Sequence, residues 1–160
     1  MANKKDESLD ISKFGIQKFP KDITFDRVAL WSATDLQKFD EAIKYAKIII
    51  STDSVEKSAR DYIYYGLALK GNKQYTDAIE QYQKAFDLKK DDYKPYQYMA
   101  DTYAEMGQED KALECNEIYM SHNQNATPSD YAKLANIYVQ MAEKGGAKKQ
   151  ANLDKAYGIY

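Results

Sequence analysis

The sequence predicts an all-α fold in which about nine antiparallel helices stack as a right-handed superhelix. Two observations lead to this prediction. Residues 59–92 and 93–126 can be aligned at a step of 34 residues, which is the length of a helix–turn–helix repeat. Large and small side chains return at the same places in both copies, three or four residues apart, so that they lie on one face of each helix.

The first copy gives the clearest reason for the helical hairpin. Small residues at Gly66 and Ala78 let two antiparallel helices approach closely. Tyr62, Leu69 and Tyr82 then fill the volume between neighbouring hairpins. Extending this register in both directions predicts helices at about 6–18, 22–33, 36–50, 55–71, 75–88, 92–106, 109–121, 128–144 and 149–159.

The boundaries of the predicted repeats follow from turn signals. Gly107 marks the turn inside the second copy, and Thr127 followed by Pro128 marks the start of a later helix. The chain is thus expected to be a single solenoid over 1–160, and its incomplete end repeats predict that it is a piece of a longer protein. Its parts are a half-repeat over 1–22, repeats over 23–58, 59–92 and 93–126, and a repeat over 127–160 with an insertion near 143–150.

These landmarks resemble the tetratricopeptide repeat (TPR) family. The matching residues are Tyr62, Tyr65, Gly66, Leu69, Tyr75, Ala78, Tyr82 and Ala85. The strings KFGIQKFPKDITFDRVALW and RDYIYYGLALKGNKQYTDAIEQYQKAFDL further resemble many-repeat TPR proteins exported to the envelope of Gram-negative bacteria. The resemblance implies a non-enzymatic scaffold that binds proteins or peptides in a concave groove, located in the periplasm or envelope; the alternative location is the cytoplasm.

Composition excludes several other classes of function. The 23 basic and 25 acidic side chains nearly cancel, and no dense basic cluster is present, which argues against a nucleic-acid partner. No apolar run reaches the roughly 18 residues that a membrane helix requires, so no membrane insertion is expected. One cysteine and one histidine cannot form a Cys/His metal cluster, and no cofactor motif occurs.

No catalytic group is predicted either. Cys115 and His122 lie seven residues apart on one predicted helix. About 10 Å of helical rise separates their backbones, which is too far for the imidazole to activate the thiol directly. We therefore expect no enzymatic activity.

The predicted contact surface is the inner stripe of the first helices of successive hairpins. An acidic extended peptide with apolar anchors, or a helix, fits its mixture of cationic, apolar and amide side chains. Arg60 and Lys94, one repeat apart, are candidates to bind a carboxylate. The candidate contact residues are Arg27, Trp31, Arg60, Ile63, Tyr64, Leu67, Lys94, Gln97, Tyr98, Asp101 and Asn136.

Several of these residues have a plainer interpretation. Ile63 and Leu67 can equally extend the core, Trp31 can equally pack against residues 6–18, and surface cations are often paired with neighbouring acids. Packing is also the preferred role for the landmark tyrosines Tyr62, Tyr82, Tyr96, Tyr103, Tyr131 and Tyr138. A second function, end-to-end self-association, is suggested by apolar residues near the C-terminal end, among them Tyr157. A third is an accessory region of a larger envelope protein.

Overall fold

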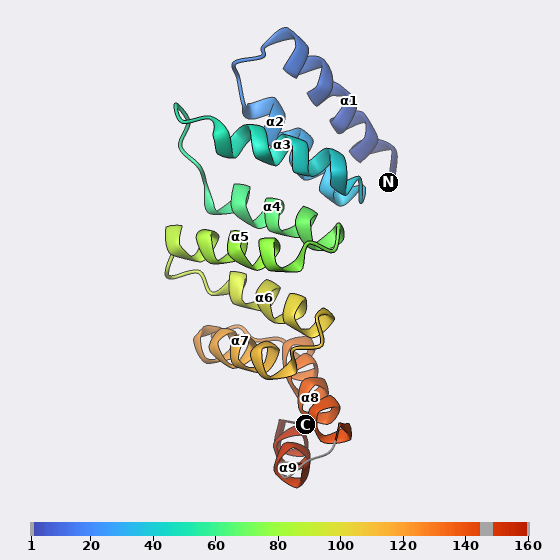
Figure 1. Ribbon diagram of the computed structural model, residues 1–160, viewed down its shortest axis with the longest axis vertical. Coiled ribbons are helices and arrows are strands. Elements are labelled where there is room, and N and C mark those ends of the chain that lie inside the picture. The colour runs from blue at the N-terminus through green and yellow to red at the C-terminus, as the bar shows by residue number, and fades with distance from the viewer. Residues whose placement is uncertain (1, 145–148, 160) are drawn as a thin grey trace. The chain divides into compact units, whose positions relative to one another are not determined.

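The computed structural model describes residues 2–144 and 149–159, which form nine α-helices and no strand (Figure 1). The all-α class is therefore confirmed. In chain order the helices are α1 (Ala2–Lys18), α2 (Thr24–Asp35), α3 (Phe39–Ser51), α4 (Ala59–Gly71), α5 (Tyr75–Leu88), α6 (Lys94–Glu105), α7 (Glu109–His122), α8 (Pro128–Glu143) and α9 (Lys149–Ile159).

The helices belong to two compact units, Met1–Lys90 with α1 to α5 and Asp91–Tyr160 with α6 to α9. Within each unit every helix packs on the next one in the chain, and α2 also packs on α4. The units divide in the link between α5 and α6, beside the predicted repeat boundary at residue 92. A single solenoid over 1–160 stays a prediction. The insertion predicted near 143–150 falls largely on residues 145–148, outside the described residues.

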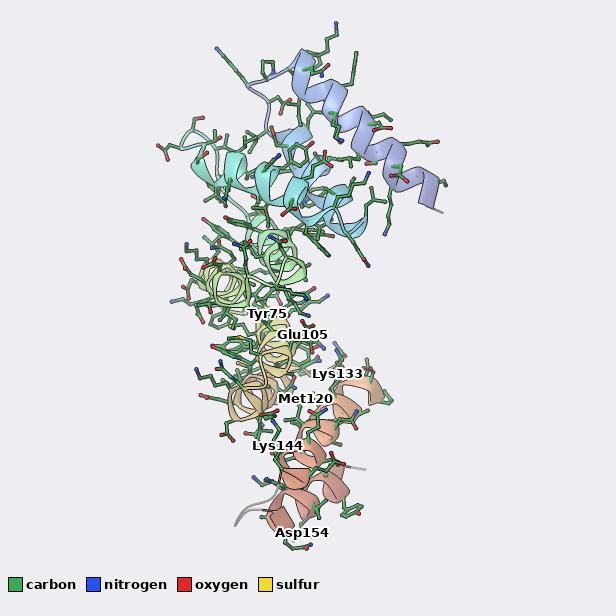
Figure 2. All side chains as sticks on the ribbon, turned by 45° about the vertical axis from the view of Figure 1, so that its right-hand side comes forward. Tyr75, Glu105, Met120, Lys133, Lys144 and Asp154 are labelled. Atoms are coloured by element: carbon green, nitrogen blue, oxygen red, sulfur yellow. The ribbon has the colours of Figure 1, made fainter. Side chains whose placement is uncertain are left out.

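Alanines dominate the buried interior of both units, and this allows helices to pack closely. The first unit buries Leu9, Ala29, Leu30, Ala33, Ala42, Ala46, Ile49, Ala68, Leu69, Ala78, Tyr82 and Ala85. The second buries Met99, Ala100, Ala112, Leu134, Ala135, Tyr138 and Ala156. In the second unit Leu113, Val139 and Met120, the last labelled in Figure 2, complete the packing around Leu134 and Tyr138.

Gly66 of α4 lies directly under the ring of Tyr82 of α5. A Cβ atom at Gly66 would stand 2.4 to 2.9 Å from three atoms of that ring. Tyr82 is fully buried, so the ring cannot move into solvent. The pair explains the predicted need for a small residue at this landmark, because the two helices of the hairpin approach to a distance that only glycine permits.

The landmark tyrosines differ in burial. Tyr82 and Tyr138 are buried, as predicted for packing residues. For Tyr131 the prediction is wrong, since its side chain is 47% exposed. Tyr131 lies in the first turn of α8 beside the exposed residues Thr127 and Pro128, where no neighbouring helix covers it within the described part of the chain. The other three, Tyr62, Tyr96 and Tyr103, are partly buried.

The turns inside three hairpins share one backbone conformation. Gln37, Lys73 and Gly107 have φ angles of 60°, 61° and 72°, in the left-handed region that favours glycine. In each turn the next residue donates its backbone N–H to the carbonyl five residues before it, which satisfies one orphan carbonyl of the preceding helix. These bonds are Lys38 N to Ala33 O at 2.8 Å, Gln74 N to Leu69 O at 2.8 Å and Gln108 N to Tyr103 O at 2.9 Å.

Capping residues correct one predicted helix boundary. The helix predicted from residue 55 begins at Ala59, because Ser58 and Asp61 form a reciprocal capping box. Residues 52–58 are therefore a link. The predicted start at Pro128 is confirmed, and Thr127 with Asp130 forms the same kind of box there.

Replacing Gly66 by alanine should destabilise the first unit by about 2 kcal/mol, since the new methyl group overlaps the Tyr82 ring. Urea unfolding followed by circular dichroism measures the change. Gly158→Ala is the control, because no atom lies within 4 Å of a Cβ built there. The control should be neutral or stabilising by up to about 1 kcal/mol, since alanine is the better helix former. Equal effects at both sites would contradict the packing argument.

The hairpin turns should respond in opposite directions to exchange of glycine. Gly107→Ala forces a Cβ into the left-handed region and should cost about 1 kcal/mol. Lys73→Gly relieves that strain and should stabilise the first unit. The gain should be only roughly 0.5 kcal/mol, because the larger loss of backbone entropy of glycine on folding offsets part of it. Thermal unfolding of both variants tests the pair, and a destabilised Lys73→Gly variant would count against it.

Candidate partner-binding site

The first unit contains a pocket of about 590 Å³ between α2, the first turn of α4 and the link that precedes α4. Three predicted contact residues, Arg27, Trp31 and Arg60, line this pocket together. We call it the Arg60 pocket. Its full lining is Arg27, Trp31, Val55, Glu56, Lys57, Ser58 and Arg60.

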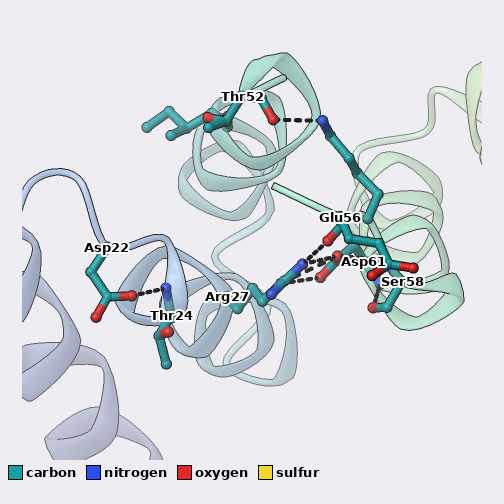
Figure 3. A network of polar contacts seen from close by, with 9 residues as sticks. Asp22, Thr24, Arg27, Thr52, Glu56, Ser58 and Asp61 are labelled. Atoms are coloured by element: carbon teal, nitrogen blue, oxygen red, sulfur yellow. Dashed lines mark hydrogen bonds and ion pairs between the residues drawn. The ribbon is translucent and has the colours of Figure 1, made fainter. Parts of the chain in front are cut away.

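Arg27 is engaged in holding the wall of the Arg60 pocket together. Its guanidinium donates from Nε to both carboxylate oxygens of Asp61, at 3.0 and 3.2 Å, and from Nη2 to one of them at 2.8 Å (Figure 3). The same Nη2 donates to the backbone carbonyl of Glu56 at 2.7 Å. Arg27 thus joins α2 to α4 and to the link, rather than presenting a free cation to a ligand.

The carboxylate of Asp61 explains why the link takes this path. Its side chain is fully buried and accepts the backbone N–H of Ser58 at 2.9 Å, while the Ser58 hydroxyl accepts the backbone N–H of Asp61 at 3.3 Å. Lys57 adds a bond from its ammonium to the Thr52 carbonyl at 2.5 Å. These bonds fix the link against the first turn of α4.

Arg60 has a different environment from Arg27. Its guanidinium carbon lies 3.8 Å from the centre of the Trp31 ring and 5.5 Å from that of Tyr64. The two rings are 6.1 Å apart and inclined by 45°. Cation–π attraction therefore holds Arg60 over an aromatic surface. In the described part of the chain its guanidinium makes no ion pair.

Two further polar groups near α2 are enclosed without a hydrogen-bond partner among the described residues. They are the indole N–H of Trp31 and one carboxylate oxygen of Asp26. Burial raises the pKa of Asp26 above its usual value. An enclosed donor such as the Trp31 N–H destabilises the free protein until an acceptor reaches it.

Predicted contact residues of the second unit are mostly bonded within it. The Gln97 amide donates to Asp130 at 2.9 Å, and Asp101 lies 3.8 Å from the ammonium of Lys133, which Figure 2 labels. The carboxylate of Asp130 accepts the backbone N–H of Thr127, and this hydrogen bond lowers the pKa of Asp130. Gln97 and Asp101 therefore connect α6 to α8.

The remaining predicted residues stay predictions as contact residues. Ile63 and Leu67 are partly buried on α4, and Tyr98 is partly buried on α6. Lys94 and Asn136 are exposed. Because Arg60 and Lys94 belong to different units, a carboxylate site shared by them also stays a prediction.

No model of a known protein family matches the chain. The photosystem I assembly protein Ycf3 of Synechococcus sp. (strain CC9605) is 30% identical over 114 residues, which cover 65% of this chain and 65% of that protein. The chain thus matches less than two thirds of the length of this relative.

Solved structures share the arrangement of helices. A crystal structure of MamA has a TM-score of 0.78 at 21% identity and covers 97% of this chain and 88% of that chain. The C-terminal part of a TPR repeat-containing protein from Cytophaga hutchinsonii has a TM-score of 0.79 at 20% identity, with 98% and 58% covered. This chain has the TPR fold. The stacked helical hairpins that the 34-residue step predicts are confirmed.

Cys115 of α7 is buried. Burial raises the pKa of Cys115 to about 11, so its sulfur is a protonated thiol near neutral pH and a poor nucleophile. No group of three His, Cys, Asp or Glu side chains within the described ranges could hold a metal ion. Among the same residues no helix is long and apolar enough to cross a bilayer.

Sequence reasoning missed part of the pocket lining. The predicted helix over 55–71 includes Val55, Glu56 and Lys57, whereas these residues form part of the link before α4. The missed signal is local: Ser58 followed three residues later by Asp61 is a helix-start pattern. This pattern places residues 55–58 in the link beside Arg27 rather than in the helix.

Removing the cation from the Arg27–Asp61 pair should destabilise the first unit strongly. Arg27→Leu leaves a fully buried carboxylate without its partner, and we expect a loss of about 3 kcal/mol. The double variant Arg27→Leu/Asp61→Asn also removes the charge and should recover part of that loss. Urea unfolding of the three proteins measures the difference, and a double variant no more stable than Arg27→Leu would contradict the assignment.

Proposed function

We propose that this chain is a non-enzymatic TPR scaffold that binds an acidic segment of a partner protein in the Arg60 pocket. The observation that carries the proposal is the state of Arg60. Its guanidinium is positioned by two aromatic rings, at 3.8 and 5.5 Å, and makes no ion pair within the described residues. A cation that is already oriented loses less conformational freedom when a ligand binds.

The geometry of a stacked guanidinium favours a carboxylate ligand. When the planar group lies over a ring, its N–H donors point outward in the plane of the group. A carboxylate can accept two of these N–H donors side by side. Such a bidentate, charge-assisted pair of hydrogen bonds is a strong contact between arginine and a peptide. Arg60 is exposed, so a ligand can approach this edge.

The charge balance of the pocket supports the same ligand. Arg27 is neutralised by Asp61, and Lys57 donates to a neutral carbonyl rather than to an acid. The lining therefore keeps the charges of Lys57 and Arg60 against that of Glu56. This small positive excess favours an acidic segment, whereas it is too small to suggest nucleic acid.

The likeness to Ycf3 supports a scaffold rather than an enzyme. Ycf3 is named an assembly protein, and a role in holding partner proteins together is proposed here by analogy.

The location in the periplasm or cell envelope belongs to the same proposal and rests on the likeness of residues 13–31 and 60–88 to exported TPR proteins. Self-association stays an alternative; Tyr157 on α9 is 73% exposed.

Replacing Arg60 by glutamine should weaken binding of acidic peptides at least about tenfold, since a charge-assisted pair is lost. The probes are octapeptides of glycine and serine that carry two adjacent glutamates and one phenylalanine at varied positions. Trp31 is the only tryptophan and lies in the pocket, so its fluorescence reports binding at the site. Binding of the glutamate peptides should also weaken as salt is raised.

Two controls make this test specific. Peptides with glutamine in place of glutamate should bind at least about tenfold more weakly than their acidic partners. The variant Lys47→Gln removes one positive charge from an exposed position on α3 that does not line the pocket, and it should bind like the parent protein. Equal binding of acidic and amide peptides, or equal losses in the two variants, would overturn the proposal.

A further inference from the structure

A second hollow of about 740 Å³ adjoins the Arg60 pocket in the first unit. The link between α1 and α2, residues 19–23, forms most of its lining, and Thr24, Arg27 and Val55 complete it. Arg27 and Val55 also line the Arg60 pocket, so the two hollows share a wall. We call the second hollow the Phe19 pocket.

The polar groups around the Phe19 pocket are largely satisfied by the protein itself. Asp22 accepts the backbone N–H of Thr24 at 3.0 Å (Figure 3). Hydrogen bonding from the side chain of Thr24 and then from its backbone N–H lowers the pKa of the Asp22 carboxyl. The backbone N–H of Asp22 donates to the carbonyl of Phe19 at 2.9 Å. The guanidinium of Arg27 faces Asp61 and Glu56. What remains for a ligand is chiefly the apolar surface of the pocket.

Phe19 gives this apolar surface a fixed position. Its side chain is 59% exposed, although it lies in a link rather than in a helix. Its ring stacks on that of Phe25 from α2, with centres 5.9 Å apart and planes inclined by 14°. An exposed phenylalanine that is held in place by a second ring is a surface on which another apolar side chain can pack without ordering the protein first.

We propose that the Phe19 pocket receives an apolar side chain, best an aromatic one, of the same acidic segment whose carboxylate binds Arg60. This inference rests on the proposed function, and two observations select the occupant. The shared wall makes the two hollows one continuous surface. Lys21 and Asp22 balance one another in the lining of the Phe19 pocket, so the joined surface keeps the small positive excess of Lys57 and Arg60 over Glu56, which complements an acidic chain.

The proposal predicts a spacing for the ligand. In an extended chain, residues two apart point to the same side and lie roughly 6.6 Å apart. An apolar residue and an acidic residue that occupy adjoining pockets should therefore be separated by two or four positions in the segment. A separation of one or three positions directs the two side chains to opposite faces and should not bind better than the acid alone.

The test uses octapeptides of glycine and serine with a single glutamate, so that each peptide has one spacing, and compares them with and without a phenylalanine by Trp31 fluorescence and calorimetry on the full chain. On the parent protein, phenylalanine two or four positions from a glutamate should tighten binding about tenfold, the effect of burying one large apolar side chain. Phe19→Ser should reduce this advantage to less than about twofold while leaving the affinity for the peptide without phenylalanine unchanged.

Phe14→Ser is the matched control, since Phe14 is 60% exposed on α1 and does not line the Phe19 pocket. It should keep the full advantage of the phenylalanine peptides. Val55→Ser is a second test variant on the other side of the pocket and should lose that advantage as Phe19→Ser does. Circular dichroism melts show whether each variant keeps its fold, so that a loss of binding in a folded variant is assigned to the pocket.

The outcomes separate this inference from the proposed function. If acidic peptides bind through Arg60 and phenylalanine adds nothing at any spacing, the Phe19 pocket is not a subsite and the proposed function stands. If phenylalanine peptides bind equally well with glutamine, the pocket takes apolar groups without regard to charge and the inference is overturned. If the free chain associates with itself and Phe19→Ser abolishes that association, the occupant is a second copy and the inference is likewise overturned.

Discussion

The buried carboxylate of Asp61 is the interaction on which the candidate site depends. It caps α4 through the N–H of Ser58 and binds the guanidinium of Arg27 from α2. One side chain thus decides where α4 begins, where the preceding link runs and how α2 is joined to α4. Because a fully buried carboxylate is stable only when all these partners are present, the link and both helices are ordered together.

The same constraint divides the polar residues of the first helices into two groups. Arg27 binds Asp61, 34 residues later, and Gln97 binds Asp130, 33 residues later, so the repeat places a donor opposite the capping acid of the next hairpin. Residues in this position serve the stacking of hairpins. Arg60 lies one residue before a capping acid and has aromatic neighbours instead. A ligand is therefore expected to meet Arg60 rather than Arg27.

Periodicity in the sequence predicts what depends on packing, and it fails where a single hydrogen bond decides. The helices of residues 2–144 and 149–159 and the close contact at Gly66 follow from the repeating large and small residues. The start of α4 does not follow from this repeat. The four residues before Ala59 have a composition that suits a helix, and only the hydrogen bonds between Ser58 and Asp61 make the helix begin at Ala59. The exposed ring of Tyr131 and the left-handed turn at Lys73 are further cases, since the repeat landmark alone does not report local cover or backbone angle.

The candidate site combines helices that are fixed by close packing with links whose path is fixed by hydrogen bonds. This division indicates how a TPR stack gains a specific partner. The helices are constrained by close packing, which leaves few of their inner positions free to change. The links 19–23 and 52–58 are less constrained by packing, since Ile23 is their one buried residue, and they supply most of the lining of both pockets. Substitutions in a link can alter the shape and charge of a pocket without disturbing the stacked hairpins. In the proposed site the helices hold Trp31 and Arg60 in place, and the links set the shape and charge of the surface beside them.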